Sequence, residues 1–281
     1  MLDVAARQAA ATTLWRLSAA GGQLPELPVG ERPGDIADGW AVQRALDVLA
    51  GPRIGWKVAS TSPASQQRLG ITEPMAGALY EWQLVPNMGT VSPTHLRIVE
   101  GEFAFRMSAD LDPALAPFTV ADVLGCVGSV HAGVEVPDSR LANYPHVSTP
   151  QLIADFMLAR FYVLGDALDV SPAELRDVEV VVRRNGTQVS RGTGRDVLGD
   201  PCNVLVWLAH ELARRGEQFR AGDLITTGAC ALVSGITEGD TVIATFAGCV
   251  DVGVRIAAPD RPDHDPDGPA PPGQRAPQEV A

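Results

Sequence analysis

Hydrophobic side chains in the first part of the chain recur at the spacing of amphipathic helices. Residues 3–18 place apolar side chains three or four positions apart, and residues 35–49 do the same, so two helices are predicted. The stretch 24–34 is rich in Pro and Gly and predicts the loop between them. A short strand over 54–59 and a helical turn or two over 63–69 follow, so this region is predicted to be mainly helical.

Beyond about residue 90 the pattern changes to short runs that are β-branched or that alternate apolar and polar residues. Asn185-Gly186 lies between two of these runs and is a strong hairpin signal. Helical patterns interrupt the runs at 120–131, 151–164 and 203–215. Strands are predicted over 91–99, 102–107, 133–136, 178–184, 187–190, 223–226 and 241–246. Hairpin strands with helices set apart from them indicate the α+β class.

The charge and the apolar content of the chain limit the classes of protein it can be. A hydrophobic fraction of 46% over 281 residues is enough for a sizeable core. The formal net charge of −12 argues against nucleic acid or an anionic membrane surface as a partner, because both need clustered Lys and Arg. The chain starts without the apolar run of a signal peptide, and no segment has the roughly 18 apolar residues of a membrane span. A cytoplasmic protein is therefore expected.

The four cysteines are far apart in the sequence and form no C-x-x-C pair. This spacing predicts neither a zinc knuckle nor a redox motif, but four buried thiols in a reducing cytosol. Residues 259–281 are rich in Pro and Asp and are predicted to form a disordered tail, because they offer almost no apolar surface to bury. The predicted organisation is a mainly helical N-terminal domain (1–85), a larger β-rich domain (86–258) and this tail.

The segment Val99-Glu100-Gly101-Glu102-Phe103 combines two acidic residues with an apolar strand pattern. In a strand, Glu100 and Glu102 point to the same face, because side chains alternate with a period of two. Two carboxylates side by side on a half-buried strand repel each other and lose hydration, and a bound cation relieves both effects. Oxygen ligands favour Mg2+, Mn2+ or Ca2+. The alternative for this pair is a solvated strand face.

A third acidic residue, Glu135, lies inside the otherwise apolar run 133–136. A lone charge in such a strand is costly. Glu135 therefore either pairs with Arg140 or a similar base, or binds a cation. Asp138 follows a proline and is interpreted as a turn or capping residue.

Lys57 and His131 are candidates for acid or base chemistry. Lys57 is flanked by apolar strand residues and is either an exposed edge residue or a base or electrostatic clamp in a cleft. His131 lies four residues before Glu135 and is either an acid/base group beside it or a structural histidine. The glycines of segment 191–194 fit no phosphate-binding motif, which disfavours a nucleotide site. The absence of a G-x-S-x-G motif disfavours a serine hydrolase.

Taken in order, these segments resemble the 2-keto-4-pentenoate hydratase / 4-oxalocrotonate decarboxylase group of the fumarylacetoacetate hydrolase superfamily. The resemblance covers nearly everything from about residue 35 to 256. Its most specific part is the Glu-x-Glu of Glu100 and Glu102, followed by Glu135 in a strand that ends Asp-Ser-Arg. The matching segments are 38–43, 55–61, 99–105, 134–140, 185–186, 199–201, 207–209, 221–223 and 227–228.

The resemblance implies a mixed β-roll, fumarylacetoacetate hydrolase-like, as the catalytic domain over 86–258, with a small helical domain before it. It implies that Glu100, Glu102 and Glu135 bind Mg2+ or Mn2+. It also places Lys57 at the position of the lysine that this family carries. The implied activity is that of a hydratase-type lyase in the catabolism of aromatic compounds, adding water to a small 2-hydroxy-dienoic acid such as 2-hydroxypenta-2,4-dienoate. A small 2-oxo acid is the expected partner, and a homo-oligomer is the expected assembly.

Two positions depart from the pattern of the hydratases and make the expected pocket more apolar. Met75 replaces the acidic residue that usually follows the proline, and Glu73, just before that proline, is the candidate substitute. Phe156 stands where the family often has Asn. Decarboxylation, cleavage of an acylpyruvate carbon–carbon bond and tautomerisation on the same scaffold are therefore alternatives. A non-catalytic protein that binds a 2-oxo acid or supports a partner enzyme is the alternative from another class.

Overall fold

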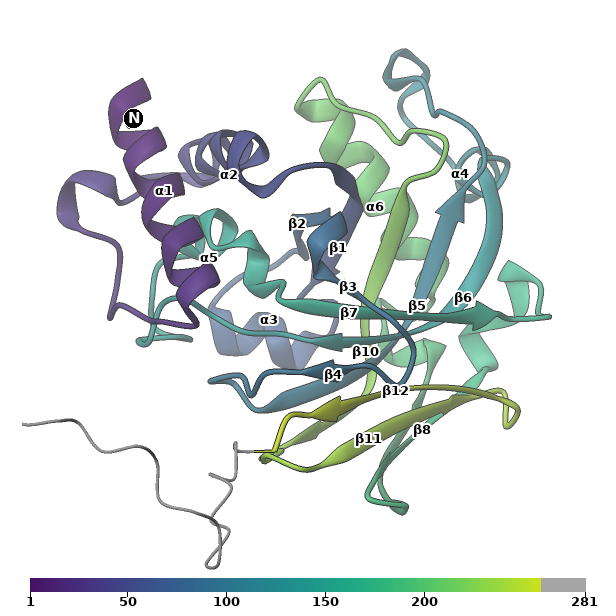
Figure 1. Ribbon diagram of the computed structural model, residues 1–281. Helices are drawn as coiled ribbons and strands as arrows, with labels where there is room; N and C mark the ends of the chain where they lie inside the picture. The colour runs from purple at the N-terminus through teal and green to yellow at the C-terminus, as the bar shows by residue number, and fades with distance from the viewer. Residues whose placement is uncertain (259–281) are drawn as a thin grey trace, which may run out of the picture.

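The computed structural model describes residues 1–258, which form two β-sheets flanked by helices (Figure 1). The larger sheet has seven strands and the smaller has five. The larger contains β1 (Arg53–Ala59), β2 (Met75–Tyr80), β3 (Leu84–Val85), β5 (Ile98–Met107), β6 (Val127–Val136), β7 (Phe161–Ala167) and β10 (Leu224–Ser234). The smaller contains β4 (Thr90–Val91), β8 (Glu179–Arg184), β9 (Thr187–Thr193), β11 (Thr241–Phe246) and β12 (Val250–Ile256).

The strand order of the larger sheet is β2-β1-β10-β5-β6-β7-β3. β10 pairs in parallel with β1 and antiparallel with β5, so the sheet is mixed and joins strands that are distant in the sequence. The smaller sheet has the order β4-β12-β11-β8-β9. Mixed sheets with separate helices confirm the predicted α+β class.

The two sheets pack against each other, and their side chains form one continuous hydrophobic core with those of the helices. Phe103 of β5 and Phe246 of β11 meet edge to face there, with ring centroids 5.3 Å apart. Because side chains alternate along a strand, Glu100 and Glu102 point from β5 to the opposite face of the larger sheet. The core thus fixes which side of β5 carries the acidic residues.

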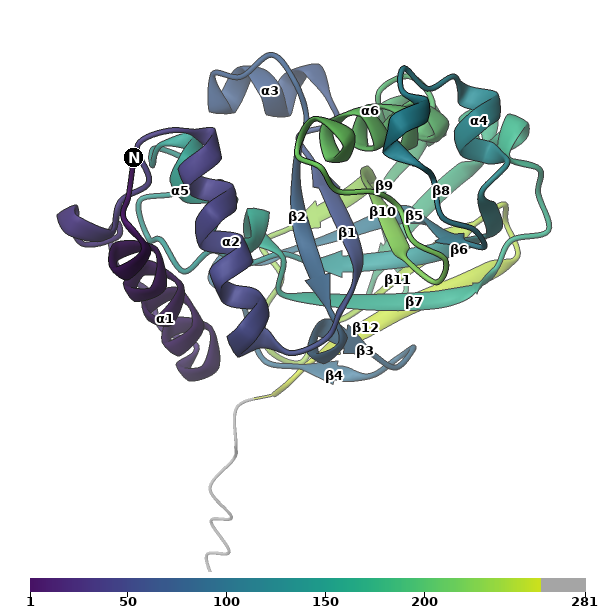
Figure 2. The same ribbon diagram turned by 90° about the horizontal axis from the view of Figure 1, so that it is seen from above.

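Helices cover the flanks of the larger sheet. Figure 2 shows α1, α2 and α5 gathered at one side, with α4 and α6 at the other. The α-helices are α1 (Val4–Ala20), α2 (Ile36–Ala50), α3 (Pro63–Leu69), α4 (Val120–Leu124), α5 (Thr149–Ala154) and α6 (Pro201–Arg214). Short 3-10 segments lie at η1 (Val29–Glu31), η2 (Glu81–Gln83), η3 (Pro113–Leu115), η4 (Phe156–Leu158), η5 (Pro172–Asp177) and η6 (Gly194–Asp196).

Capping residues explain where the long helices begin. Asp3, Asp35 and Asp200 each accept a hydrogen bond from a backbone N–H of the first turn of α1, α2 and α6. These helices confirm the three predicted near 3–18, 35–49 and 203–215. The hairpin predicted at Asn185-Gly186 is also confirmed, since both residues have the positive φ of a tight turn, 51° and 82°, between β8 and β9.

The helix predicted over 120–131 is wrong in its second half. α4 ends at Leu124, and the chain from Val127 onward forms β6. This stretch is rich in Val and small residues and pairs with β5 from Val127 to Glu135. Pairing with a strand distant in sequence therefore overrides the local helical spacing.

The helix predicted over 151–164 is wrong for the same reason. α5 ends at Ala154, and the aromatic and β-branched run from Phe161 forms β7, which pairs with β6. Between them, the three residues 156–158 have φ values of 54°, 49° and 67°, in the left-handed region. Such a turn cannot continue a right-handed helix.

Strand boundaries also differ from the predictions. The runs predicted over 91–99 and 102–107 are the short β4 and a single long β5 that begins at Ile98. Pro93 lacks a backbone donor and Arg97 has a φ of 54°, so the backbone leaves the sheet between these strands. β2 and β12 were not predicted, because Gly77 and Gly253 interrupt their apolar patterns.

The cysteines are all free, and the prediction that all four are buried is wrong. Cys202 and Cys230 are buried, whereas Cys126 is partly exposed and Cys249 is exposed. Cys249 lies in the turn between β11 and β12, where the chain reverses at the surface.

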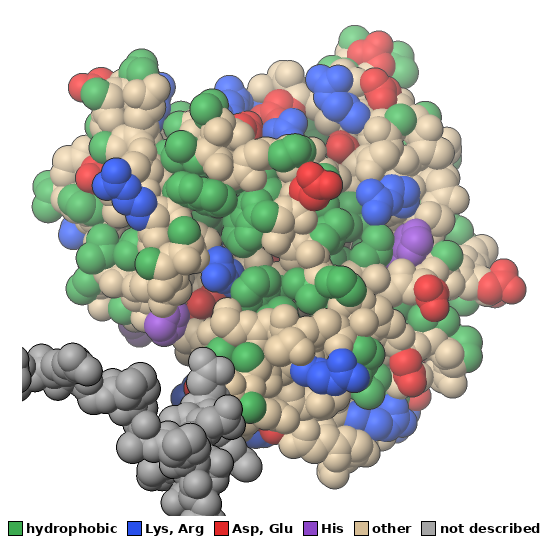
Figure 3. All heavy atoms as spheres, in the orientation of Figure 1, with side chains coloured by type: hydrophobic (Ala, Val, Ile, Leu, Met, Phe, Trp, Pro, Cys, Tyr) green, Lys and Arg blue, Asp and Glu red, His purple; other side chains and the backbone are tan. Residues whose placement is uncertain are grey.

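The N-terminal third of the chain contributes strands to the larger sheet. β1 pairs with β10 and β3 pairs with β7, although β1 and β3 fall within the predicted N-terminal domain. The boundary at residue 85 stays a prediction, and the predicted tail, 259–281, lies outside the described residues. Within residues 1–258 no helix is both long and apolar enough to cross a bilayer. On the face drawn in Figure 3, basic and acidic side chains are interspersed.

Candidate metal centre

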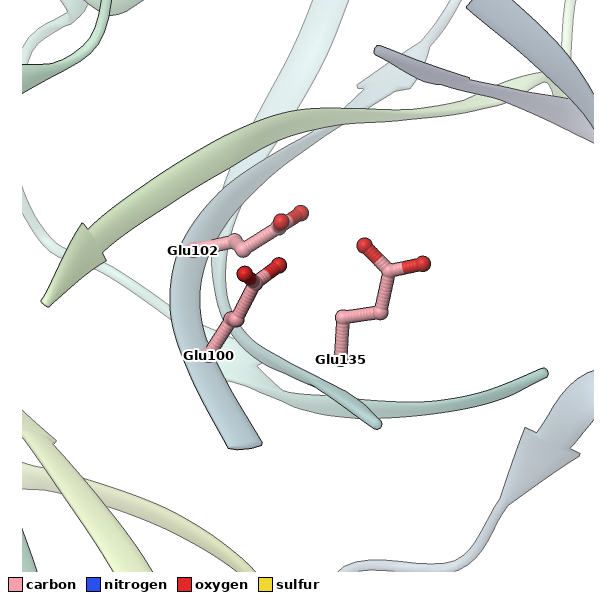
Figure 4. Close-up of side chains that lie close together, drawn as sticks. All are labelled: Glu100, Glu102 and Glu135. Atoms are coloured by element: carbon pink, nitrogen blue, oxygen red, sulfur yellow. The ribbon is translucent and has the colours of Figure 1, made fainter. Parts of the chain in front are cut away.

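Three glutamates from two neighbouring strands converge on the concave face of the larger sheet. Glu100 and Glu102 lie two residues apart on β5 and therefore share a face. Glu135 lies on β6 directly opposite Glu100 in the antiparallel register. One carboxylate oxygen from each lies within 4.8 Å of the others. Figure 4 shows the three carboxylates directed toward one common space.

Two of these carboxylates are buried, Glu100 is partly buried, and several of their oxygens have no partner among the described residues. Glu102 is 0% exposed and Glu135 is 2% exposed. Neither carboxylate oxygen of Glu102, nor Oε2 of Glu135, has a hydrogen-bond partner among residues 1–258. A buried charge without a partner costs several kcal/mol. Oxygen atoms that converge without partners fit a hard divalent cation, which takes an all-oxygen ligand set.

The crowding of the three acids changes their proton affinity. Burial, together with the negative charge of Glu135, raises the pKa of Glu100 to about 7. Burial, together with the charges of Glu135 and Glu100, raises the pKa of Glu102 well above its usual range. Without a cation the cluster thus retains protons that carboxylic acids ordinarily release near pH 4.

Lys57 is the basic partner of the cluster. Its Nζ lies 3.0 Å from Oε1 of Glu135 and donates to the backbone oxygen of Met157, also at 3.0 Å. The side chain is buried, so Lys57 is not the exposed edge residue that was one interpretation of the sequence. Burial acts to lower the pKa of Lys57, but the charges of the three glutamates outweigh it, so the pKa is raised. Lys57 is therefore charged, and its ammonium group offsets part of the negative charge of the cluster.

A strained backbone segment supplies the second acceptor of Lys57. Residues 156–158 are three consecutive non-glycine residues in the left-handed region. They lie against Gly77 of β2, where a Cβ atom would come within 2.4 Å of the Phe156 oxygen. Left-handed non-glycine residues cost of order 1–3 kcal/mol each and cluster at functional sites. Here the strained backbone holds the carbonyl oxygen of Met157 within hydrogen-bond distance of Lys57 Nζ.

Arg140 does not pair with Glu135, which was one of the two alternatives for that glutamate. Arg140 instead binds Asp155 through Nε and its backbone N–H, and its Nη1 donates to the Ala159 oxygen at 3.0 Å. Ser139 Oγ donates to Asp155 as well, at 2.8 Å. The guanidinium of this buried ion pair lies over the ring of Phe156 in η4.

A cavity of about 140 Å³ gives access to the cluster. Lys57, Glu100 and Glu102 line it, together with apolar and hydroxyl-bearing side chains. Met75 and Phe156 do not line it, so the expectation that these two residues make the pocket more apolar is wrong. Phe156 packs instead against Tyr80, with ring centroids 5.9 Å apart.

Two sequence candidates lie outside this cavity. Glu73 is exposed and lines a separate, mostly apolar pocket with Met75 and Trp207. The ring of His131 contacts the Ser129 hydroxyl at 2.8 Å and the Gly165 oxygen at 3.1 Å, a structural arrangement within the sheet. The structure therefore brings Lys57 to the three glutamates but places neither Glu73 nor His131 there.

Two lining residues were not singled out from the sequence. Arg68 of α3 and Tyr144, in the loop after β6, both line the cavity. Arg68 Nη2 donates to the Tyr144 hydroxyl at 3.3 Å. No local pattern marks either residue, because the two segments meet only in the folded chain.

Comparisons with known proteins show which sequences and structures this chain is similar to. The family described as fumarylacetoacetate (FAA) hydrolase C-terminal matches residues 85–257. A 2-keto-4-pentenoate hydratase of Paraburkholderia phymatum is 32% identical over 230 residues, covering 76% of this chain and 84% of that protein. A 4-oxalocrotonate decarboxylase of a Pseudomonas species is 30% identical over 219 residues, covering 77% and 82%. The structure of 4-oxalocrotonate decarboxylase from Pseudomonas putida G7, complexed with magnesium and adipate, matches with a TM-score of 0.82 at 26% identity, covering 91% of this chain and 99% of that one.

Proposed function

Because this chain belongs to the fumarylacetoacetate hydrolase family, in its group of 2-keto-4-pentenoate hydratases and 4-oxalocrotonate decarboxylases, we propose that it is a metal-dependent lyase of hydratase type. Its substrate is a small 2-hydroxy-dienoic acid such as 2-hydroxypenta-2,4-dienoate, to which it adds water. The family membership and the mixed β-roll fold are those predicted from the sequence. The observation that carries the proposal is a set of three convergent carboxylates beside Lys57, at a cavity large enough for a small acid. Glu102 is fully buried there without a hydrogen-bond partner among residues 1–258.

Glu100, Glu102 and Glu135 are the residues that would hold the divalent ion, and Mg2+ or Mn2+ is the proposed identity. A bound ion supplies Lewis-acid stabilisation of the negative charge that develops at the 2-oxygen of the substrate. A bound cation would also lower the pKa of the glutamates, which would then release the protons that they retain because of burial.

Lys57 is the proposed proton-handling residue. Its ammonium group is held between Glu135 Oε1 and the Met157 oxygen, each at 3.0 Å, so its position is fixed before substrate binds. A charged amine at that position neutralises the substrate carboxylate or moves a proton while the enol becomes a ketone. Water then adds across the remaining double bond.

The alternatives on the same scaffold are decarboxylation, hydrolysis of an acylpyruvate carbon–carbon bond and tautomerisation. All would develop negative charge at the 2-oxygen, which an ion held by the three glutamates would stabilise, and they differ in the bond that breaks or forms next. A non-catalytic binding role is disfavoured, because all three acidic side chains converge and Lys57 lies 3.0 Å from Glu135.

Product analysis tests the proposal directly. The purified protein is incubated with Mg2+ or Mn2+ and a panel of 2-hydroxy-dienoic and 2-oxo acids, and the products are weighed by mass spectrometry. A product that has gained one water supports the hydratase. Loss of carbon dioxide or formation of two fragments would replace it with a decarboxylase or a hydrolase, and no turnover of any acid would end the proposal.

We also propose a homo-oligomer in the cytoplasm. The support is the resemblance to a family whose members usually assemble and the lack of any membrane-spanning helix within residues 1–258. Light scattering on the purified chain measures the assembly, and a strictly monomeric mass would contradict it.

A further inference from the structure

Tyr162 of β7 carries a buried hydroxyl group beside the three glutamates. Its oxygen has no hydrogen-bond partner among the described residues. Tyr162 lies directly opposite Glu135 in the antiparallel register of β6 and β7, and Glu135 lies directly opposite Glu100. Since directly opposite residues point to the same face of a sheet, the tyrosine side chain shares the face that carries the cluster. Tyr162 does not line the cavity, so it does not reach a substrate bound there.

A glycine directs this hydroxyl toward Glu102. A Cβ atom at Gly133 of β6 would lie 1.9 Å from the Tyr162 hydroxyl oxygen, so the tyrosine ring lies across the strand at that glycine. Gly133 is the residue directly opposite Glu102 in the register of β5 and β6. Opposite residues of an antiparallel pair have Cβ positions about 4.5–5.5 Å apart. The hydroxyl therefore lies next to the Glu102 side chain, and the lack of a side chain at position 133 leaves room for it.

Tyr162 has an unused donor where Glu102 has unused acceptors. Both carboxylate oxygens of Glu102 and the Tyr162 hydroxyl are buried, and none of them has a hydrogen-bond partner within the described part of the chain. The ring itself packs against the apolar side chains of Leu79, Ala104 and Leu224. A phenylalanine would make these contacts equally well and would avoid burying an unpaired hydroxyl, which is unfavourable. Packing of the ring therefore does not account for the hydroxyl.

We propose that Tyr162 is a positioning residue, which donates a hydrogen bond to the carboxylate of Glu102 when a divalent ion is bound. This inference rests on the proposed function, because it takes the three glutamates to be the ligands of that ion. A donor to the remaining lone pairs of a ligating carboxylate fixes its orientation and supports the binding of the ion. The hydroxyl hydrogen rotates to face its acceptor, and a bond to a charged carboxylate is stronger than one between neutral groups.

Calorimetric titration of the metal-free protein with Mg2+ tests this inference. Tyr162→Phe removes the hydroxyl and keeps the ring, so we expect about tenfold weaker Mg2+ binding, the lower end of the usual effect of losing such a donor. The metal-free variant should unfold at the wild-type temperature or above it, because the metal-free protein loses no hydrogen bond. A merely structural hydroxyl would do the reverse: its removal would lower the unfolding temperature and leave the Mg2+ affinity unchanged.

Tyr80 provides the matched control. Its ring is also fully buried, but its hydroxyl donates to Asp47 Oδ1 at 2.7 Å, and it does not line the cavity. Tyr80→Phe should therefore lower the unfolding temperature by about 2–4 °C, because a hydrogen bond is lost. It should leave the Mg2+ affinity unchanged. The two variants delete the same atom from the same type of residue and are expected to have opposite effects.

The results that would overturn the inference are distinct from those that would end the proposed function. An unchanged Mg2+ affinity in Tyr162→Phe, with an ion-binding wild type, would end the inference alone. Equal weakening by Tyr80→Phe would also end it, by showing a general response to the loss of a buried hydroxyl. A lower unfolding temperature for metal-free Tyr162→Phe would show that the hydroxyl already has a partner and would end it too. A wild type that binds neither Mg2+ nor Mn2+ would end both.

Discussion

Two clusters of buried charge lie on either side of η4, and they differ in how completely they are paired. Asp155 accepts bonds from Ser139 Oγ, the Arg140 backbone N–H and Arg140 Nε, and Arg140 in turn reaches the Ala159 oxygen. Glu102 has no hydrogen-bond partner among residues 1–258, although both it and Asp155 are 0% exposed. The carboxylate of the Asp155 cluster is fully hydrogen-bonded within the protein. The glutamate cluster is incomplete, because it contains carboxylate oxygens without a donor among the described residues.

The difference indicates what each cluster does. A buried carboxylate with several donors stabilises one conformation of the loops around it, and losing it leaves an arginine buried without a partner. A buried carboxylate without donors destabilises the metal-free fold and becomes favourable only with a cation. Burial and charge do not distinguish a structural carboxylate from a cation-binding one. The number of hydrogen-bond donors around the carboxylate does.

The largest effect is expected from breaking the complete cluster. Asp155→Ala should lower the free energy of unfolding by about 3–5 kcal/mol, because it leaves Arg140 buried and uncompensated. Urea denaturation measures the change. A loss below about 1 kcal/mol would show that the pair is dispensable and would remove the contrast between the two clusters.

Removing one acid from the incomplete cluster should affect turnover and leave stability intact. Glu102→Gln should lower kcat/KM by roughly 10²–10³-fold and weaken Mg2+ binding, because a ligand oxygen loses its charge. The free energy of unfolding of the metal-free variant should be unchanged or higher, since like-charge repulsion is relieved. Glu238→Gln, at an exposed turn, is the control. Full activity in Glu102→Gln would exclude this residue from the site.

The response of the pH dependence of stability to Mg2+ should separate the two clusters, because burial raises the pKa of Asp155 as well as that of Glu100. The pKa of Glu100 is raised to about 7 in the folded protein from its ordinary value of 4.5, so the folded state binds more protons between these values. This contribution to stability is fully present below about pH 4.5 and is lost as the pH rises through 7.

Metal-free protein should therefore lose about 2 kcal/mol between pH 5 and pH 8, and saturating Mg2+ should abolish that loss. Thermal unfolding at several pH values, with and without Mg2+, measures both. A metal-free stability that rises over this range would contradict the raised pKa.

The smallest effect is expected from removing a single hydrogen-bond donor from the Asp155 cluster. Ser139→Ala removes the hydroxyl that donates to Asp155 at 2.8 Å and leaves both bonds from Arg140 in place. The expected loss of unfolding free energy is about 1 kcal/mol, with kcat/KM within about twofold of the wild type. A loss as large as that of Asp155→Ala would show that the hydroxyl, and not the arginine, holds the carboxylate.

The sequence predicted those candidate site residues that a local pattern marks. The period of two along a strand places Glu100 and Glu102 on one face, and a lone charge in an apolar run marks Glu135. It did not decide the partner of Glu135, since both Arg140 and another base were open. The register that joins β1 to β10, and β10 to β5, brings Lys57 to the cluster instead.

Other features could not be predicted because they depend on segments that meet only after folding. The helical spacing of 120–131 and 151–164 is real, but pairing between β5, β6 and β7 overrides it. Glu73 is close in sequence to Pro74, which made it a candidate, yet it faces another pocket. Arg68 and Tyr144 carry no signal at all, because each is ordinary in its own segment.

The parallel pairing of β1 with β10 has a consequence for how such a site can change. The lysine and the acids come from separate stretches of chain: Lys57 lies on β1, in the N-terminal third, whereas all three glutamates lie on β5 and β6. The proposed metal ligands and the proposed proton-handling residue therefore lie on separate segments of the chain. A substitution at position 57 replaces the base and leaves all three carboxylates in place on β5 and β6.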